Sequence, residues 1–148
     1  MTHAENKITI NRSPGEVYGF LADGQNNTAW RSGVENIELI SGRAGEVGAI
    51  YRQVLTGSGG RAIDGDYEIV TAIPGRELGF RVIAGPARPT GRYELSTVDE
   101  GTQVRFSLDL EPKGFMRLMA PMIARTMASE VDQLSQLKAV LESEHQNP

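Results

Sequence analysis

The feature that most constrains the fold of this chain is a change of sequence period near Gly114. Before it, apolar and polar residues alternate, as they do from Val104 to Leu110, and this pattern is typical of a strand with one face on a core. Beyond it, apolar residues recur every three or four positions from Met119 to Leu141, which predicts one long amphipathic helix. We therefore expect an antiparallel sheet with a long C-terminal helix laid against it.

The start of this helix carries four of the five methionines of the chain, between Phe115 and Met127. Methionine is unbranched and polarisable, so these residues suit either an ordinary core or the wall of an apolar pocket. Pro121 interrupts the helical pattern, so the helix either begins near Ala120 or is kinked there. In both cases residues 115–119 form a separate short segment that could act as a rim or lid.

The N-terminal part predicts a strand and two short helices. Period-two alternation indicates a strand from Glu5 to Asn11. Ser13 then suits the N-cap of a helix, Pro14 its first turn, and Glu16 the last position of a capping box. A second short helix or turn is expected from Asn26 to Arg31, and it carries the only tryptophan.

Between these helices and the C-terminal helix, glycine-rich turns divide the chain into a meander of six expected strands. These are Val34–Ser41, Ala49–Thr56, Ile63–Ile73, Glu77–Ala84, Arg88–Thr97 and Thr102–Glu111. With the first strand they make an α+β protein with a curved antiparallel sheet of about seven strands.

Length and composition narrow the class of protein. With 148 residues we expect one domain, spanning 1–148 and ordered from about residue 5 to 142, with the tail from Ser143 frayed. The formal net charge is −4 and the basic residues are scattered, so we expect no nucleic-acid partner. No signal-like or membrane-spanning apolar run occurs, and we expect a cytoplasmic protein.

The sequence lacks the residue patterns that hydrolytic enzymes, metal sites and cofactor-binding sites usually require. The chain has no cysteine, and its two histidines, His3 and His145, lie in the terminal segments, where we expect them to be solvated and idle. No zinc-protease, nucleophile-elbow, phosphate-loop or dinucleotide-binding pattern occurs. We therefore expect no catalytic residue of these kinds, no metal and no cofactor.

Several segments carry a resemblance to a known superfamily. The sequences ITINRSPGEVYGFLADGQNNTAWRSGV, EVGAIYRQVLTG, YEIVTAIPGRELGFRV, GRYELSTVDEGTQVRFSLDLE, MRLMAPMIARTM and LSQLKAVLES occur in this order. They resemble the polyketide cyclase/dehydrase-like branch of the START and Bet v 1-like (SRPBCC) superfamily, from Ile8 to about Glu142. The resemblance implies a helix-grip fold with a cavity between sheet and long helix that accepts an apolar or aromatic molecule. A densely packed interior, with no void larger than a water molecule or two, would contradict this cavity and the binding function that depends on it.

Strand parity and this resemblance together suggest the residues of the site. Tyr67 shares parity with Ile69 and Tyr93 with Leu95, while Gln53 shares parity with Tyr51 and is the best candidate for an inward polar group, an exposed position being the alternative. Trp30 either packs beneath the short helices or borders the pocket mouth. The expected ligand-binding residues are Trp30, Tyr51, Gln53, Tyr67, Phe80, Tyr93, Phe106, Leu108, Phe115, Met119, Met122, Ile123 and Met127.

Arginines are the other polar candidates, because a partly buried arginine can fix a carboxylate or phenolate. Arg81 and Arg105 oppose the apolar positions of their strands and should face solvent. Arg92 shares a face with Glu94 and could pair across strands with Asp64 or Asp66. The sequence does not assign an orientation to Arg52.

Three classes of function fit these sequence features. The first is a module that binds a hydrophobic or aromatic small molecule without chemistry. The second is a cyclase or aromatase that works mainly by positioning its substrate and leaves little sequence trace. The third is a protein that acts through a protein partner, and a homodimer is also left open. We favour the first, because no buried acid–base pair is visible in the sequence.

Overall fold

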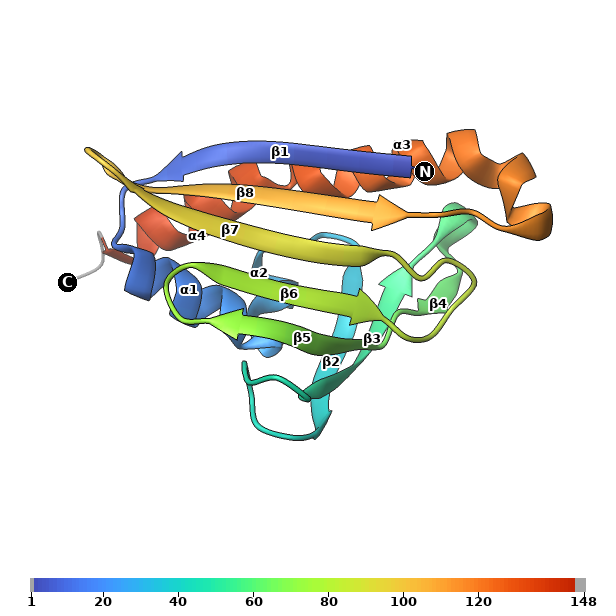
Figure 1. Cartoon of the computed structure of the whole chain (residues 1–148), viewed down its shortest axis with the longest axis horizontal. Helices are drawn as coiled ribbons and strands as arrows, with labels where there is room; N and C mark the ends of the chain where they lie inside the picture. The colour runs from blue at the N-terminus through green and yellow to red at the C-terminus, as the bar shows by residue number, and fades with distance from the viewer. Residues whose placement is uncertain (1, 146–148) are drawn as a thin grey trace.

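The structure, a computed structural model, describes residues 2–145. A twisted sheet forms one layer, and all the longer helices lie on one of its faces (Figure 1). The strands are β1 (Thr2–Ile10), β2 (Val34–Ser41), β3 (Ile50–Thr56), β4 (Ala62–Asp64), β5 (Tyr67–Ile73), β6 (Glu77–Val82), β7 (Thr90–Val98) and β8 (Gly101–Leu110). The helices are α1 (Pro14–Ala22), η1 (Gly24–Asn26), α2 (Asn27–Trp30), η2 (Ser58–Gly60), η3 (Gly114–Met119), α3 (Ala120–Asp132) and α4 (Leu134–His145).

The strands form one antiparallel sheet in the order β1-β8-β7-β6-β5-β3-β2, with β4 paired to β3. The first strand pairs with the last, in a register that runs from Thr2 opposite Leu110 to Ile10 opposite Thr102. β1 begins three residues earlier than expected, because the ten-residue β8 offers backbone partners even to the polar residues at the start of the chain, where alternation is weak.

The stretch expected to be one strand from Ile63 to Ile73 is two strands, so the sheet has eight strands rather than about seven. The strand is interrupted at Gly65 and Asp66, and both residues form hydrogen bonds with Gln53 on the neighbouring strand. The Gly65 N–H donates to the Gln53 carbonyl at 2.7 Å, and the Gln53 N–H donates to the Asp66 carboxylate at 3.2 Å. This pairing satisfies the backbone where the strand bends.

The two helix starts follow their local sequences. Ser13 is the N-cap of α1, and its Oγ accepts from the Glu16 N–H at 3.2 Å, with Pro14 in the first turn. Of the two alternatives for Pro121, the structure shows the first: α3 begins at Ala120, and residues 114–119 form the separate helix η3.

The long C-terminal helix is bent at Gln133, where α3 ends and α4 begins. Two side-chain contacts to the α2–β2 connection lie at this bend. Gln133 Nε2 donates to Ser32 Oγ at 2.9 Å, and Glu130 pairs with Arg31 at 2.6 Å. The bend therefore coincides with the place where the helix is attached to the short helices.

The helical stripe buries Met127, Val131, Leu134, Leu137 and Leu141 against the sheet. The first part of this stripe, before Met127, is not buried against the sheet in the same way. Met122 is 51 % exposed, and in η3 Phe115 and Leu118 are 76 % and 81 % exposed. The reason is visible in Figure 1, where η3 and the first turns of α3 project past the end of the sheet and meet no strand.

The outer face of the sheet carries exposed ion pairs. Arg81 lies 2.8 Å from Glu68, Arg52 3.2 Å from Glu38 and Arg105 2.9 Å from Glu5. Arg92 pairs at 3.5 Å with Glu94 of its own strand rather than with Asp64 or Asp66. All four arginines considered from the sequence thus lie outside the core.

His3 is not in a free terminal segment but in strand β1. Its ring nitrogens lie 2.6 Å from the Asp109 carboxylate and 2.8 Å from that of Glu5. These hydrogen bonds, Asp109 first, raise the pKa of His3 above its ordinary 6.5. The side chain of His145 and the end of the chain, residues 146–148, lie outside the described part.

Candidate functional site

Six aromatic side chains form a continuous row on the helix-covered face of the sheet. Five come from consecutive neighbours in the sheet: Tyr51 stacks on Tyr67 at 5.1 Å between ring centroids, Phe80 follows at 5.4 Å from Tyr67, and Tyr93 stacks on Phe106 at 4.4 Å. Phe80 bridges the two stacks, at 6.1 Å from Tyr93. Each ring is at most 7 % exposed, so the row forms the floor of the interior.

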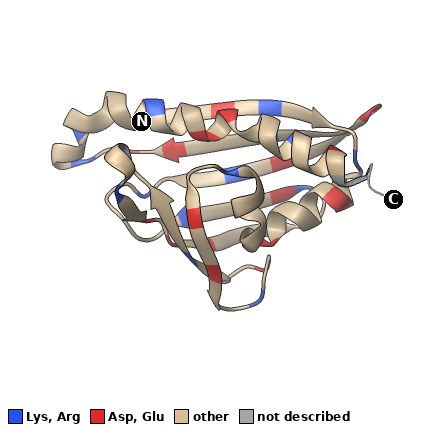
Figure 2. Ribbon diagram, turned by 180° about the vertical axis from the view of Figure 1, so that it is seen from behind, with Lys and Arg blue, Asp and Glu red and all other residues tan. Residues whose placement is uncertain are grey.

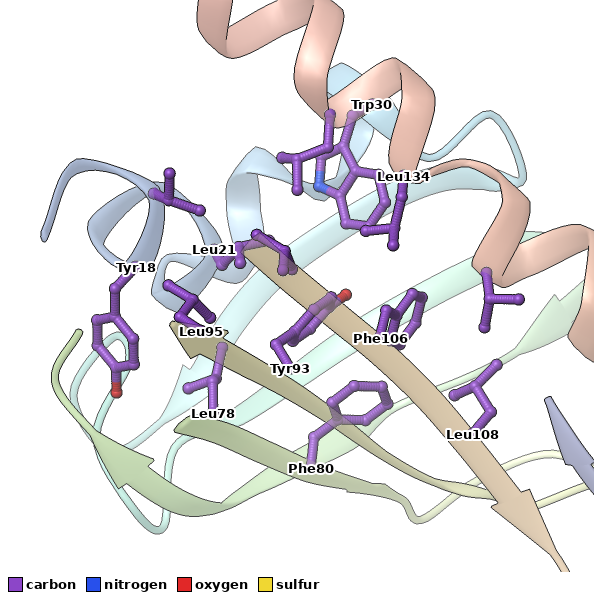
Figure 3. Close-up of a cluster of buried hydrophobic side chains, with 14 of the residues drawn as sticks. Tyr18, Leu21, Trp30, Leu78, Phe80, Tyr93, Leu95, Phe106, Leu108 and Leu134 are labelled. Carbon is purple, nitrogen blue, oxygen red and sulfur yellow. The ribbon is translucent and has the colours of Figure 1, made fainter. Parts of the chain in front are cut away.

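Trp30 closes this row from the helix side. Its ring meets Tyr93 at 6.2 Å and Phe106 at 6.3 Å, edge to face in both cases. In Figure 3 it lies between the C-terminal helix, which carries Leu134, and the strands that carry Tyr93 and Phe106. At 3 % exposure, Trp30 is buried beneath the short helices.

A buried polar cluster adjoins the tyrosines. Asn27 Nδ2 donates to the Tyr67 hydroxyl at 3.1 Å and to Gln53 Oε1 at 3.3 Å, and Gln53 Nε2 donates to the Gly65 carbonyl at 3.2 Å. Gln53 is 2 % exposed, so strand parity placed its side chain correctly. Gly24 lies against Tyr67, and a Cβ there would come within 2.1 Å of the tyrosine hydroxyl, so glycine permits this close approach.

The charged member of the interior is Arg31. Its side chain is 8 % exposed and pairs with Glu130 of α3, which is 20 % exposed. Burial works against the charged guanidinium, but Glu130, through its charge and its hydrogen bond, holds the pKa of Arg31 above its usual value. Arg31 is therefore a permanent cation inside the aromatic layer.

Tyr67 and Tyr93 remain protonated over the physiological pH range. Burial, the largest cause, raises the pKa of Tyr93 to about 12 and also raises that of Tyr67, although Arg31 opposes both shifts. Their hydroxyls can thus donate a hydrogen bond to a ligand oxygen, and they cannot serve as bases near neutral pH.

A void lies among these polar groups, lined by Asn27, Arg31, Tyr67, Phe80 and Tyr93 with three aliphatic neighbours. Its volume is about 10 Å³, which is enough for roughly one water molecule. The buried Nε–H of Arg31, which lines this void, has no hydrogen-bond partner among the described residues. In this conformation the void among these described residues has no room for a ligand larger than a water molecule, because the aromatic rings fill the space around it.

A larger hollow of about 430 Å³ lies on the surface, beside α2 and the bend at Gln133. Hydroxyl, amide and carboxylate side chains make up most of its wall, with Ser32, Asp132 and Gln136 among them. It lacks the apolar lining of a site for a hydrophobic molecule.

The interior is less tightly closed at the end where β3, β6 and β8 finish. Leu55, Val82 and Leu110 have the inward parity of their strands yet remain half-buried, and so does Ile123 of α3. In Figure 1 η3 and the start of α3 project past this end of the sheet. The apolar side chains at this end are therefore partly accessible to solvent.

Comparison with known proteins adds the family. The model of the family described as "Polyketide cyclase / dehydrase and lipid transport" matches residues 1–142. The chain belongs to this family. The comparison with curated proteins gave no match.

Solved structures agree with the cyclase/lipid-transport family on the fold. A START superfamily protein from Mycobacterium smegmatis superposes with a TM-score of 0.78 at 11 % identity, covering 97 % of this chain and 99 % of that one. A protein from Thermus thermophilus gives a TM-score of 0.78 at 20 % identity, covering 95 % and 98 %. One from Chromobacterium violaceum gives 0.72 at 15 %, covering 96 % and 99 %. At these identities the likeness concerns the helix-grip fold.

The cyclase/lipid-transport fold brings most of the expected site residues together. The aromatic row, Gln53, Leu108 and Met127 are buried in one layer, and Ile123 is half-buried against it, whereas Met119 is half-buried in η3 and is not among the side chains packed against this core. Phe115 and Met122 are not part of it, because their segment extends beyond the sheet.

Sequence reasoning missed two of the buried polar residues, Asn27 and Arg31. Both lie at the second short helix, where a polar residue carries no periodic signal for its direction. The one available hint was Trp30: a segment that buries so large a ring also brings its neighbours close to the core.

Two further properties concern the described residues 2–145. No group of three or more histidine, aspartate or glutamate side chains is arranged to hold a metal ion. None of the helices there has the length and apolar character needed to cross a bilayer.

Proposed function

We propose that this chain binds an apolar or aromatic small molecule that carries an anionic or hydrogen-bond-accepting group, in the layer between the sheet and the C-terminal helix. The observation that carries the proposal is Arg31, a buried cation that lines a void and whose Nε–H has no partner among the described residues. Leaving a buried donor unsatisfied costs about 1–3 kcal/mol, and a ligand oxygen would remove that cost.

Binding requires the aromatic layer to open, since the void holds only one water. The incomplete burial of Leu55, Val82 and Leu110, together with that of Ile123, supports opening at the η3 end. Affinity would come from apolar burial, at roughly 25 cal/mol per Å², and orientation from Arg31 and the Tyr93 hydroxyl. The tyrosine donates, because its raised pKa keeps it protonated.

A cyclase-like enzyme that positions a reactive chain is the second candidate. The observation in its favour is that protonated Tyr93 and the permanent cation Arg31 adjoin the same void, where they could stabilise an enolate oxygen. Unchanged ligand after prolonged incubation, checked by mass spectrometry, would favour binding; a cyclised or dehydrated product would favour the enzyme.

The test is thermal denaturation with matched ligand pairs. Long-chain and flat aromatic carboxylic acids and their methyl esters are added, together with quinones, since a ligand that binds only the folded state raises the melting temperature. We expect the acids to raise it more than their esters. In the double variant Arg31→Gln/Glu130→Gln, which has no interior charge, the preference for acids should disappear.

The control is the double variant Arg81→Gln/Glu68→Gln, which removes a similar ion pair from the outer face and should keep the preference. If no acid, ester or quinone stabilises the native protein, and none is retained on purification, the proposal of an interior binding site is wrong.

A further inference from the structure

The segment formed by η3 and the first turns of α3 presents an apolar surface to solvent. Phe115 is 76 % exposed, Leu118 81 % and Met122 51 %. Elsewhere in the described residues only Val47, at 64 %, is a large apolar side chain exposed by more than half. Three such side chains within eight residues form a patch, which on a monomer marks a contact surface.

The same segment is basic in an acidic protein. Lys113, Arg117 and Arg125 lie in it, and no Asp or Glu occurs from Pro112 to Ser129, although the formal net charge of the chain is −4. None of these three cations takes part in an ion pair between the described residues, whereas the arginines of the outer sheet face are paired. Figure 2 shows this end of the molecule at the left, where the ribbon of the helical segment carries Lys or Arg positions in blue and no Asp or Glu position in red.

Apolar and basic side chains share one side of the segment. Met122 follows Leu118 by four residues and Arg125 follows Met122 by three, which is the spacing of neighbours on one helical face. The opposite side, with Ile123 and Met127, turns towards the core. An exposed apolar strip bordered by unpaired cations matches the interface of an anionic bilayer, where rings and aliphatic chains enter the headgroup region and cations meet lipid phosphates.

We propose that residues 113–125 dock this protein on the surface of an anionic lipid bilayer, with Phe115, Leu118 and Met122 inserted and Lys113, Arg117 and Arg125 on the headgroups. A second copy of the chain fits this surface less well. A two-fold interface would place the patch against itself, and the three cations of each copy would then repel those of the other. This docking goes beyond the interior binding site and does not depend on it.

Sedimentation with lipid vesicles tests the docking. Vesicles of phosphatidylcholine alone are compared with vesicles containing about 30 mol % phosphatidylglycerol. We expect binding to the anionic vesicles only, and loss of that binding as salt rises from about 0.05 to 0.5 M, because salt screens the lipid charge. Phe115→Ser/Leu118→Ser should abolish binding. Arg117→Gln/Arg125→Gln should weaken it about tenfold or more, since each basic residue contributes roughly fivefold near such a surface.

Two variants serve as matched controls. Val47→Ser removes an exposed aliphatic side chain, and Arg43→Gln an exposed cation, both on the distant β2–β3 connection; neither should change binding. The variant Leu118→Trp gives a second readout by tryptophan fluorescence. The native Trp30 is buried, so its own emission should not change when vesicles are added. The fluorescence of the variant should shift to the blue with anionic vesicles.

Three results would overturn the inference. The first is equal or absent binding to both kinds of vesicle. The second is anionic binding that persists in Phe115→Ser/Leu118→Ser. The third is a concentration-dependent dimer that the same double variant abolishes, without any vesicle binding, which would show that a second copy covers the patch.

Discussion

At the scale of single residues, the aromatic row depends on what its neighbours lack. Gly91 of β7 lies opposite Phe80 of β6, and a Cβ at Gly91 would lie 2.2 Å from the tip of the Phe80 ring. The missing side chain is therefore what leaves room for the Phe80 ring between Tyr67 and Tyr93, to both of which it is tilted. Sequence periodicity indicates which strand residues face inward, but it does not indicate which glycine leaves room for them.

Substitution of Gly91 by alanine tests this dependence. Gly91→Ala should lower the free energy of unfolding by about 1–3 kcal/mol, because the ring must move within a packed core. Urea denaturation measures the change. Gly19→Ala in α1, where a Cβ meets no atom within 4 Å, should instead raise stability by about 0.5–1 kcal/mol. Equal effects of the two substitutions would mean that crowding at Phe80 does not matter.

At the scale of elements, α3 is held to the short helices by Arg31 and Glu130 and by the contact of Gln133 with Ser32. The alternation of β8 and the Ser13 cap were predictable, since each depends on local sequence. The break at Gly65, the bend at Gln133 and the position of Arg31 were not, because each is set by a partner far along the chain.

Breaking the attachment of α3 should be costly. Glu130→Gln leaves the Arg31 cation buried without its counter-ion, and we expect a loss of roughly 3 kcal/mol in the free energy of unfolding. The double variant Arg31→Leu/Glu130→Leu should lose clearly less, since no charge then stays buried. Glu68→Gln, at the exposed pair with Arg81, should cost under about 1 kcal/mol. A Glu130→Gln cost as small as that of Glu68→Gln would contradict the structural role of the pair.

At the scale of the whole molecule, the helix-grip fold could be predicted from the order of its elements, whereas the state of its interior could not. Strand parity correctly predicted that the side chains of Tyr51, Gln53, Tyr67 and Tyr93 point inward. Whether four such side chains enclose a hollow or fill it depends on how the rings stack, and here Tyr93 lies 4.4 Å from Phe106. A void of about 10 Å³ leaves no trace in a pattern of apolar positions.

Stability of the whole molecule should depend on pH through the cluster that joins β1 to β8. The raised pKa of His3 means that its protonated form stabilises the fold below about pH 6.5 and that this contribution is lost as pH rises through the folded pKa. Hydrogen bonds from Arg105, and then from His3, lower the pKa of Glu5 to about 2, so its contribution is present above about pH 4.5 and is lost in stronger acid.

The difference in melting temperature between the native chain and His3→Asn should therefore be largest between about pH 4.5 and 6.5 and should vanish in alkaline buffer. Differential scanning calorimetry at low salt measures it. The control is Lys7→Asn, four residues after His3 on the same face of β1. Its difference in melting temperature should show no such dependence on pH. A His3→Asn difference that stays constant from acid to alkaline buffer would contradict the role of the cluster.

The pairing of the first strand with the last also governs how the chain can assemble during synthesis. Thr2 meets Leu110 and Ile10 meets Thr102, so a nascent chain that stops short of Gly101 has no partner for β1. Residues 2–10 must therefore remain without this partner until residues 102–110 have been synthesised. Such late closure between distant segments slows folding, and it makes the emergence of β8 the step that completes the sheet.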